Sequence, residues 1–133
     1  MSEQYSARCD CGEVALEMTS DPRVHAFCNC EDCRTLLDMP YHPVVAWDAD
    51  QVRIVSGEEH TVEYRYPTLE MHRVFCKHCG ETLYNTNAMG WKIVTQLLIS
   101  KCNEDELPAE FESNAHFYYD RRIVDITDQL QKS

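Results

Sequence analysis

Several segments of the chain alternate apolar and polar residues with a period of two. Segment 13–18 places Val14, Leu16 and Met18 on one face, and segment 61–66 alternates throughout. Segment 92–99 places Ile93, Leu97 and Ile99 around Thr95. Successive side chains of a β-strand point to opposite faces, so each segment predicts a strand with one buried face. Shorter strand candidates are 24–28, 43–47, 51–55, 72–76, 82–85 and 115–119. Proline and glycine residues separate these segments, and short strands at such spacing predict a mainly β fold.

Helical signals are few. Residues 31–37 are expected to form one or two turns. A second short helix is expected over 103–107, because Asn103 is a suitable N-cap and Glu106 follows three residues later. No linker or low-complexity stretch interrupts the sequence, so residues 1–133 are expected to form a single domain.

The charge of the chain narrows the range of partners. Its 133 residues carry a formal net charge of −11, and the nearest approach to a basic cluster is the pair Arg121-Arg122. An acidic field repels phosphate backbones, so nucleic acid is not expected as a partner. The sequence carries no signal for an oligomeric state.

Targeting and membrane signals are also missing from the sequence. The N-terminal residues lack the apolar segment of a signal peptide. No apolar run approaches the roughly 20 residues that a membrane-spanning helix needs. We therefore expect a cytoplasmic protein with no membrane partner. In that reducing compartment, clustered cysteines indicate metal ligands rather than disulfides.

Cysteine spacing is the most informative chemical feature of the sequence. Of the eight cysteines, seven fall into three clusters. Two of these clusters each end on a glycine; they are Cys9-x-Cys11-Gly12 and Cys76-x-x-Cys79-Gly80. Four thiolates suit a tetrahedral zinc ion, and glycine can adopt the positive φ of a tight ligand turn. The two clusters therefore predict one closed structural zinc site that joins distant parts of the chain.

The remaining cluster is Cys28-x-Cys30-x-x-Cys33, which offers three thiolates within six residues. Three protein ligands and an open fourth position are typical of a catalytic zinc. A closed site is the alternative, with a fourth ligand taken from His25, His42, His78 or Cys102. An internal disulfide in the absence of metal is a third reading. Cys102 stands apart from the clusters and is expected to be a small buried residue. His42 is a candidate for contact with substrate.

The joint pattern resembles one protein family. The residues that carry the resemblance are Cys9-Asp-Cys11-Gly12, Cys28-Asn-Cys30-Glu-Asp-Cys33-Arg34, Arg73-Val-Phe-Cys76-Lys-His-Cys79-Gly80 and the late segment Asn114-Ala-His116-Phe-Tyr-Tyr-Asp. Together they are similar to the glutathione-dependent formaldehyde-activating enzyme family, also called the centromere protein V family. The resemblance spans roughly residues 5–120. One departure is Asn29, which stands where the family usually has histidine.

The resemblance implies a β-tent fold of small antiparallel sheets organised around zinc. It implies two zinc ions per chain, a structural ion on Cys9, Cys11, Cys76 and Cys79 and a catalytic ion on Cys28, Cys30 and Cys33. It also implies an activity that joins glutathione to formaldehyde, which is classed as a carbon–sulfur lyase for the reverse direction. A small-molecule thiol is then the expected substrate.

Two hypotheses about function follow from these features. The first is a zinc-dependent carbon–sulfur lyase in which Arg34 and Arg73, each beside a cysteine cluster, pair with substrate carboxylates. The second is a non-catalytic, zinc-stabilised binding module. Four protein ligands on the second zinc would favour the binding module, as would an exposed apolar strip around Trp47, Met89 and Trp91.

Overall fold

A computed structural model describes residues 4–37 and 39–133. Most of the regular elements are short strands, so the predicted mainly β fold is confirmed. The strands are β1 (Tyr5–Arg8), β2 (Ala15–Met18), β3 (Val24–Cys28), β4 (His42–Asp48), β5 (Val52–Ser56), β6 (Thr61–Arg65), β7 (His72–Cys76), β8 (Thr82–Thr86), β9 (Trp91–Thr95), β10 (Ala115–Phe117) and β11 (Gln131–Lys132). The two α-helices are α1 (Glu31–Leu37) and α2 (Gln96–Lys101).

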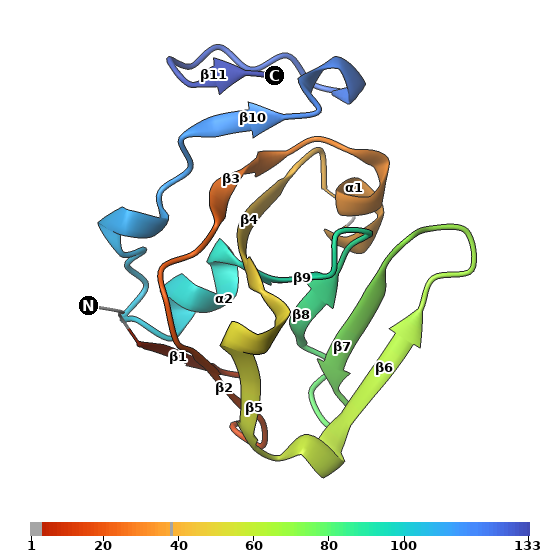
Figure 1. Ribbon diagram of the computed structural model, residues 1–133, viewed down its shortest axis with the longest axis vertical. Coiled ribbons are helices and arrows are strands. Elements are labelled where there is room, and N and C mark those ends of the chain that lie inside the picture. The colour runs from red at the N-terminus through yellow and green to blue at the C-terminus, as the bar shows by residue number, and fades with distance from the viewer. Residues whose placement is uncertain (1–3, 38) are drawn as a thin grey trace.

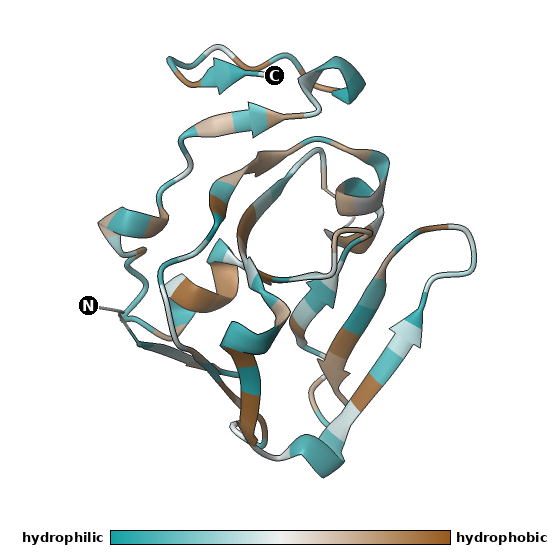
Figure 2. Ribbon diagram, viewed as in Figure 1, coloured by the Kyte–Doolittle hydropathy of each residue, from teal (hydrophilic) through white to brown (hydrophobic). Residues whose placement is uncertain are grey.

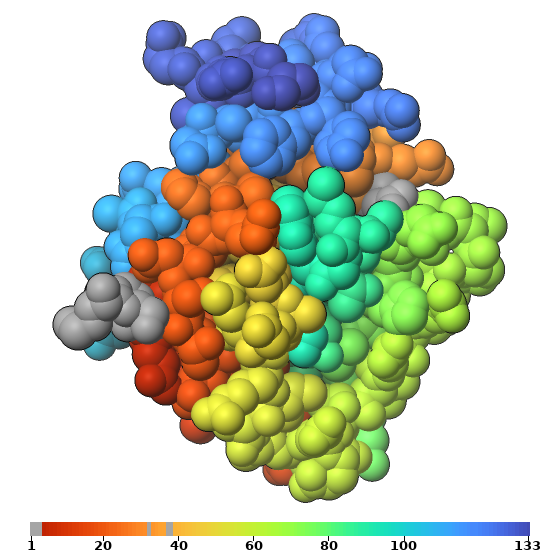
Figure 3. Space-filling view, in the orientation of Figure 1, coloured from red at the N-terminus to blue at the C-terminus, as the bar shows by residue number. Residues whose placement is uncertain are grey.

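The strands form two sheets that Figure 1 shows lying against each other. The smaller sheet has the order β1-β2-β5, and the larger has the order β11-β10-β3-β4-β9-β8-β7-β6. Nearly all neighbours are antiparallel, as hairpin connections require. The exceptions are the two parallel pairings of β10, with β3 and with β11. Because of these pairings, the C-terminal segment extends the large sheet beyond β3, and Figure 3 shows it (blue) packed on that region (orange).

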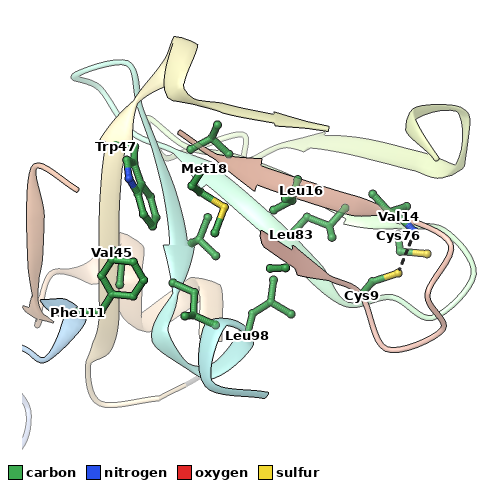
Figure 4. Packing of buried hydrophobic residues seen from close by; sticks show 14 residues of the cluster. Cys9, Val14, Leu16, Met18, Val45, Trp47, Cys76, Leu83, Leu98 and Phe111 are labelled. Atoms are coloured by element: carbon green, nitrogen blue, oxygen red, sulfur yellow. Dashed lines mark hydrogen bonds between the residues drawn. The ribbon is translucent and has the colours of Figure 1, made fainter. Parts of the chain in front are cut away.

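One core joins the two sheets. Figure 4 shows Leu16 and Met18 from the small sheet meeting Val45, Trp47 and Leu83 from the large one. Leu98 of α2 and the fully buried Phe111 close the same cluster. β4 is buried from His42 to Trp47, and this explains why its sequence does not alternate. β6 alternates in hydropathy, as its banding in Figure 2 illustrates, but the buried face expected for it does not form, because Val62 and Tyr64 are exposed.

The expected strand over 92–99 is wrong after Thr95. There the chain turns into α2, and the Thr95 side chain accepts a hydrogen bond from the backbone N–H of Leu97. Leu98 and Ile99 are buried while Leu97 is exposed. A strand would place Leu97 and Ile99 on one face. In the helix, Leu97 faces solvent while the apolar residues Leu98 and Ile99 face the core.

The expected helix over 103–107 is also wrong. Glu104 and Asp105 adopt the left-handed conformation, with φ of 57° and 61°. Asn103 bonds to Glu106 within this turn, through its amide and its backbone carbonyl. A short polar segment without an apolar face gains too little from packing to hold a helix, and local turn bonds dominate.

Two further observations bear on the sequence-based hypotheses. Trp47 is fully buried and donates its indole N–H to the Ser20 carbonyl oxygen at 2.7 Å, so the exposed strip of Trp47, Met89 and Trp91 does not form. Within residues 4–37 and 39–133, neither helix has the length and apolar character needed to cross a membrane.

Candidate metal centres

The four cysteines Cys9, Cys11, Cys76 and Cys79 come together in space. Their sulfur atoms all lie within 4.8 Å of one another. The first two come from the turn after β1, and the other two from the turn after β7. These turns are far apart in sequence, since Cys11 and Cys76 are separated by 65 positions along the chain. Both turns lie low in the view of Figure 1, where β7 ends.

A glycine amide closes each of the two turns by donating to the carbonyl of the turn's first cysteine. Gly12 N–H donates to the Cys9 carbonyl, and Gly80 N–H to the Cys76 carbonyl, at 2.9 and 2.8 Å. Both glycines have positive φ, 79° and 77°. Cβ atoms would make this conformation costly, so the sequence needs glycine at both positions. The turns differ in length, since Gly12 bonds three residues back and Gly80 four, but both bring two cysteine side chains to one centre.

Backbone amides also point at the thiols. Val14 N–H donates to Cys9 Sγ at 3.4 Å, the dashed line in Figure 4, and His78 N–H donates to Cys76 Sγ at 3.4 Å. Burial raises the pKa of Cys79, but the backbone N–H groups of Cys11 and Glu81 outweigh it and lower that pKa to about 7. These backbone hydrogen bonds favour thiolates, which are the form that binds metal. At Cys11 a backbone hydrogen bond with Glu13 also lowers the pKa, but burial and hydrogen bonds with the neighbouring thiols outweigh it and raise that pKa to about 12.

The spacing of the sulfur atoms fits one tetrahedral ion. Zinc–sulfur bonds of about 2.3 Å in a tetrahedron put neighbouring sulfurs roughly 3.8 Å apart. Cys11 Sγ lies 3.6 Å from both Cys9 Sγ and Cys76 Sγ. A disulfide would need about 2.0 Å, so these cysteines are not bonded to each other. The donor set and its dimensions therefore suit a four-coordinate metal site.

The second cluster forms where β3 ends and α1 begins, in the upper half of Figure 1. The sulfur atoms of Cys28, Cys30 and Cys33 lie within 4.8 Å of one another, and Cys28 and Cys30 are 3.4 Å apart. Cys28 and Cys33 are buried. They pack on Val44, Ala46 and Ile93, which form a small apolar cluster separate from the main core.

Crowding has a clear electrostatic effect on these thiols. A hydrogen bond to the Cys30 sulfur raises the pKa of Cys28 to about 12. Hydrogen bonds with Cys28 and Cys30 likewise raise the pKa of Cys33. Three neighbouring thiols cannot all ionise without a cation, because each thiolate repels the next. A divalent metal removes this repulsion, so the donor set also fits a metal ion.

The structure separates three of the four side chains considered as a fourth ligand from this cluster. Cys102 is exposed, contrary to expectation, and accepts the Arg8 N–H at 3.3 Å. His25 bonds to the Glu112 carbonyl oxygen at 2.6 Å, and His78 to the His60 ring at 3.1 Å. In the described part of the chain, no fourth histidine, cysteine or acidic side chain completes the group of three.

His42 lies beside the second cluster without belonging to it. It is the direct cross-strand partner of Cys28 in the β3–β4 pair, and it is 1% exposed. Burial lowers its pKa to about 4, and the charge of Cys30 opposes that shift. Neither ring nitrogen has a hydrogen-bond partner among the described residues.

The two candidate arginines are placed differently. Arg34 follows Cys33 in α1, and its Nε donates to the Asn29 carbonyl oxygen at 3.2 Å. As a whole, Arg34 is half-buried. Arg73 donates to the Thr82 hydroxyl at 2.7 Å and to the Gly80 carbonyl at 3.0 Å, and so holds the turn of the first cluster.

Asn29 has a structural contact that its sequence position did not reveal. It is 1% exposed, and both its backbone N–H and its side-chain amide donate to the Phe117 carbonyl oxygen, at 3.0 and 3.2 Å. These bonds attach β10 to the start of the second cluster. An amide between two cysteines gives no sign of such a contact, because its partner lies 88 residues away.

Comparisons with known proteins agree with this architecture. A Schizosaccharomyces pombe protein named as an uncharacterized lyase is 31% identical over 81 residues, which make up 61% of this chain and 56% of the relative. The matched stretch thus spans little more than half of that relative's length. A crystal structure of a Rhodobacter sphaeroides protein has the same fold, with a TM-score of 0.57, 20% identity, and coverage of 77% of this chain and 97% of that one.

The sequence profile of one family covers most of the chain. It is the profile described as glutathione-dependent formaldehyde-activating enzyme, and it matches residues 4–121. That range contains both cysteine clusters, whose sulfur atoms converge as metal ligands do. The chain therefore belongs to the glutathione-dependent formaldehyde-activating enzyme family.

Proposed function

We propose that this protein is a zinc-dependent enzyme that forms or breaks the carbon–sulfur bond of a thiol–aldehyde adduct. In this proposal, Cys28, Cys30 and Cys33 hold the catalytic zinc, and the four-cysteine centre holds a structural one. Glutathione with formaldehyde is the first candidate pair, because the family carries that name. The lyase name of the S. pombe relative supports the reaction class.

The difference between the two ligand sets carries the proposal. One centre offers four sulfur atoms and the other offers three, with no fourth protein ligand among the described residues. A fourth position left to substrate is what distinguishes catalytic from structural zinc sites. The alternative of a binding module has no support from an exposed Trp47 strip, since Trp47 is buried.

The reaction needs little from the protein beyond activation and placement. In the forward direction a carbon–sulfur bond forms between a thiol and an aldehyde carbon, and the thiol proton ends on the former carbonyl oxygen. A zinc ion with an open position lowers the pKa of a bound thiol and can polarise a carbonyl. The reverse reaction breaks the same bond and returns the proton to sulfur.

Arg34 is proposed to bind a substrate carboxylate. Arg34 is the next residue in the chain after Cys33. Its Nε donates to the Asn29 carbonyl oxygen, and the other N–H groups of the guanidinium remain available to bind a ligand. Arginine can bind a carboxylate through two parallel hydrogen bonds. Arg73 is the weaker candidate, since its bonds to Thr82 and Gly80 occupy it at the first cluster. We also propose that the protein resides in the cytoplasm, a compartment that keeps cysteine thiols reduced.

The test is metal content followed by thiol titration. The purified protein should contain two zinc ions per chain. With Co²⁺ in the three-cysteine site, a small thiol should intensify the sulfur-to-cobalt charge-transfer band. Formation of the hydroxymethyl adduct from glutathione and formaldehyde, followed by NMR, should be faster with the protein than without it. A cobalt spectrum of the second site that does not change with any added thiol would contradict the proposal.

A further inference from the structure

We propose that His42 is a positioning residue for the three-cysteine centre: its ring N–H donates a hydrogen bond to a thiolate of the metal-loaded site. This inference rests on the proposed function only in assuming that the three cysteines hold a metal. It adds a residue outside the ligand set to the centre, and it assigns that residue a measurable effect on the metal.

The strand register places the imidazole beside the ligands. Cys28 and His42 face each other directly across β3 and β4. Directly opposed residues of an antiparallel pair project from the same face, with Cβ atoms about 5 Å apart. Val44 and Ala46, which follow His42 at alternate positions of β4, pack against Cys28 and Cys33. His42 therefore lies at the end of the apolar row that supports the cluster.

The burial of His42 has no other explanation in the described residues. Its side chain is 1% exposed, yet neither Nδ1 nor Nε2 has a hydrogen-bond partner there. Burying an unpaired polar group costs stability, so such groups are uncommon and are often functional. An apolar residue would pack at this position without that cost.

A second buried histidine shows the usual arrangement. His116 is also fully buried, but its Nε2 bonds to Asp128 Oδ2 at 2.8 Å, and its ring stacks near Phe27 at 5.0 Å. It pairs with Phe27 in the register, so it lies on the opposite face of the sheet from Cys28. The two histidines are equally buried, but His116 has one ring nitrogen paired and only Nδ1 without a partner, whereas neither nitrogen of His42 is paired.

Charge gives the reason for a donor beside the second cluster. Three thiolates and one divalent cation carry a net charge of −1, and two of the three cysteines are buried. A buried negative charge needs hydrogen-bond donors. A neutral thiol is a weak acceptor but a thiolate is a good one, so the imidazole N–H gains its partner when metal displaces the thiol protons. The bond also withdraws electron density from sulfur, which keeps the metal a better acceptor for a further ligand.

The experiment measures Co²⁺ binding and spectra in His42→Leu and His42→Gln. Leucine removes the donor and keeps a similar volume, while glutamine restores an N–H donor. In His42→Leu we expect Co²⁺ affinity at the second site to fall about tenfold, because partners of metal ligands commonly contribute that much. The sulfur-to-cobalt band should move to lower energy, and His42→Gln should recover part of both changes.

Two internal controls separate this role from a structural one. The four-cysteine site of the same molecule should keep its Co²⁺ affinity in every variant. With the second site stripped of metal, the melting temperature of His42→Leu should equal or exceed that of the parent, since the imidazole is then an unpaired buried polar group. His116→Leu should do the opposite, with a lower melting temperature and an unchanged cobalt spectrum. If His42→Leu does not fold, His42→Met provides the same comparison.

The other possible results of the His42→Leu experiment would contradict the role proposed for His42 or the proposed function. An unchanged band and affinity in His42→Leu would overturn the inference. Loss of one metal per chain would also overturn it, because His42 would then be a ligand. A parent protein that binds the second metal but no thiol would contradict the proposed function. The shift of the sulfur-to-cobalt band in His42→Leu would still test the hydrogen bond proposed for His42.

Discussion

The two cysteine clusters use the same ligand chemistry for different mechanical purposes. The first joins the turn after β1 to the turn after β7, and Cys9 and Cys76 belong to the main core of the two sheets. The second takes all its ligands from residues 28–33 and packs on a small separate apolar cluster. Closing a long loop restricts the unfolded chain far more than closing a short one. We therefore expect a metal on the first cluster to stabilise the fold and a metal on the second to be free to serve chemistry.

The strongest test of this contrast is Cys76→Ser. The change removes a ligand that ties the two sheets together, and metal binding in small zinc domains is linked to folding free energies on the order of 10 kcal/mol. We expect an insoluble protein or a greatly lowered melting temperature in thermal denaturation. Cys102→Ser is the matched control, because Cys102 is exposed and belongs to neither cluster. A Cys76→Ser protein that melts like the control would refute the structural assignment.

Cys30→Ser should separate metal content from stability. The cysteines of the second cluster all lie within residues 28–33, so a metal there cross-links little of the fold. For Cys30→Ser we therefore expect a native circular dichroism spectrum, a small change in melting temperature and the loss of one zinc per chain by elemental analysis. Adduct formation from glutathione and formaldehyde should be abolished. Global unfolding of this variant would show that the second ion is also structural, and the contrast between the clusters would disappear.

Graded chelation should remove the two metals in order. The second site has three protein ligands where the first has four, so a competing chelator should strip it first. We expect the first released equivalent of zinc to leave the melting temperature nearly unchanged, and the second to lower it sharply. Simultaneous release of both ions with unfolding would argue against independent sites.

The smallest expected effect concerns the arginines beside the two clusters. Arg34→Ala should weaken glutathione binding about threefold to tenfold while leaving a small uncharged thiol unaffected, because only glutathione brings carboxylates to pair. Arg73→Ala should instead lower the melting temperature, since it loses its bonds to Thr82 and Gly80. Titration of Co²⁺-loaded protein with both thiols provides the comparison. Equal losses for both thiols in Arg34→Ala would rule out carboxylate recognition by this residue.

Much of the fold was predictable where local pattern and tertiary environment agree. The strands expected over 24–28 and 72–76 and the helix expected over 31–37 have the predicted bounds. Segment 92–99 failed because its apolar residues fit a strand and a short helix about equally well, and packing of Leu98 and Ile99 decided between them. β11 could not be foreseen, since it is a two-residue strand whose only pairing is to β10.

The sequence by itself determined the ligand inventory, the grouping of seven cysteines and the two glycines that their turns require. Those features depend on residues close together along the chain, where covalent geometry limits the possibilities. Only the tertiary structure decided that Asn29 holds β10, that Arg73 belongs to the first centre and that His42 lies unpaired beside Cys28. Each of these depends on contacts between residues distant in sequence, which strand pairing and burial of the core bring together.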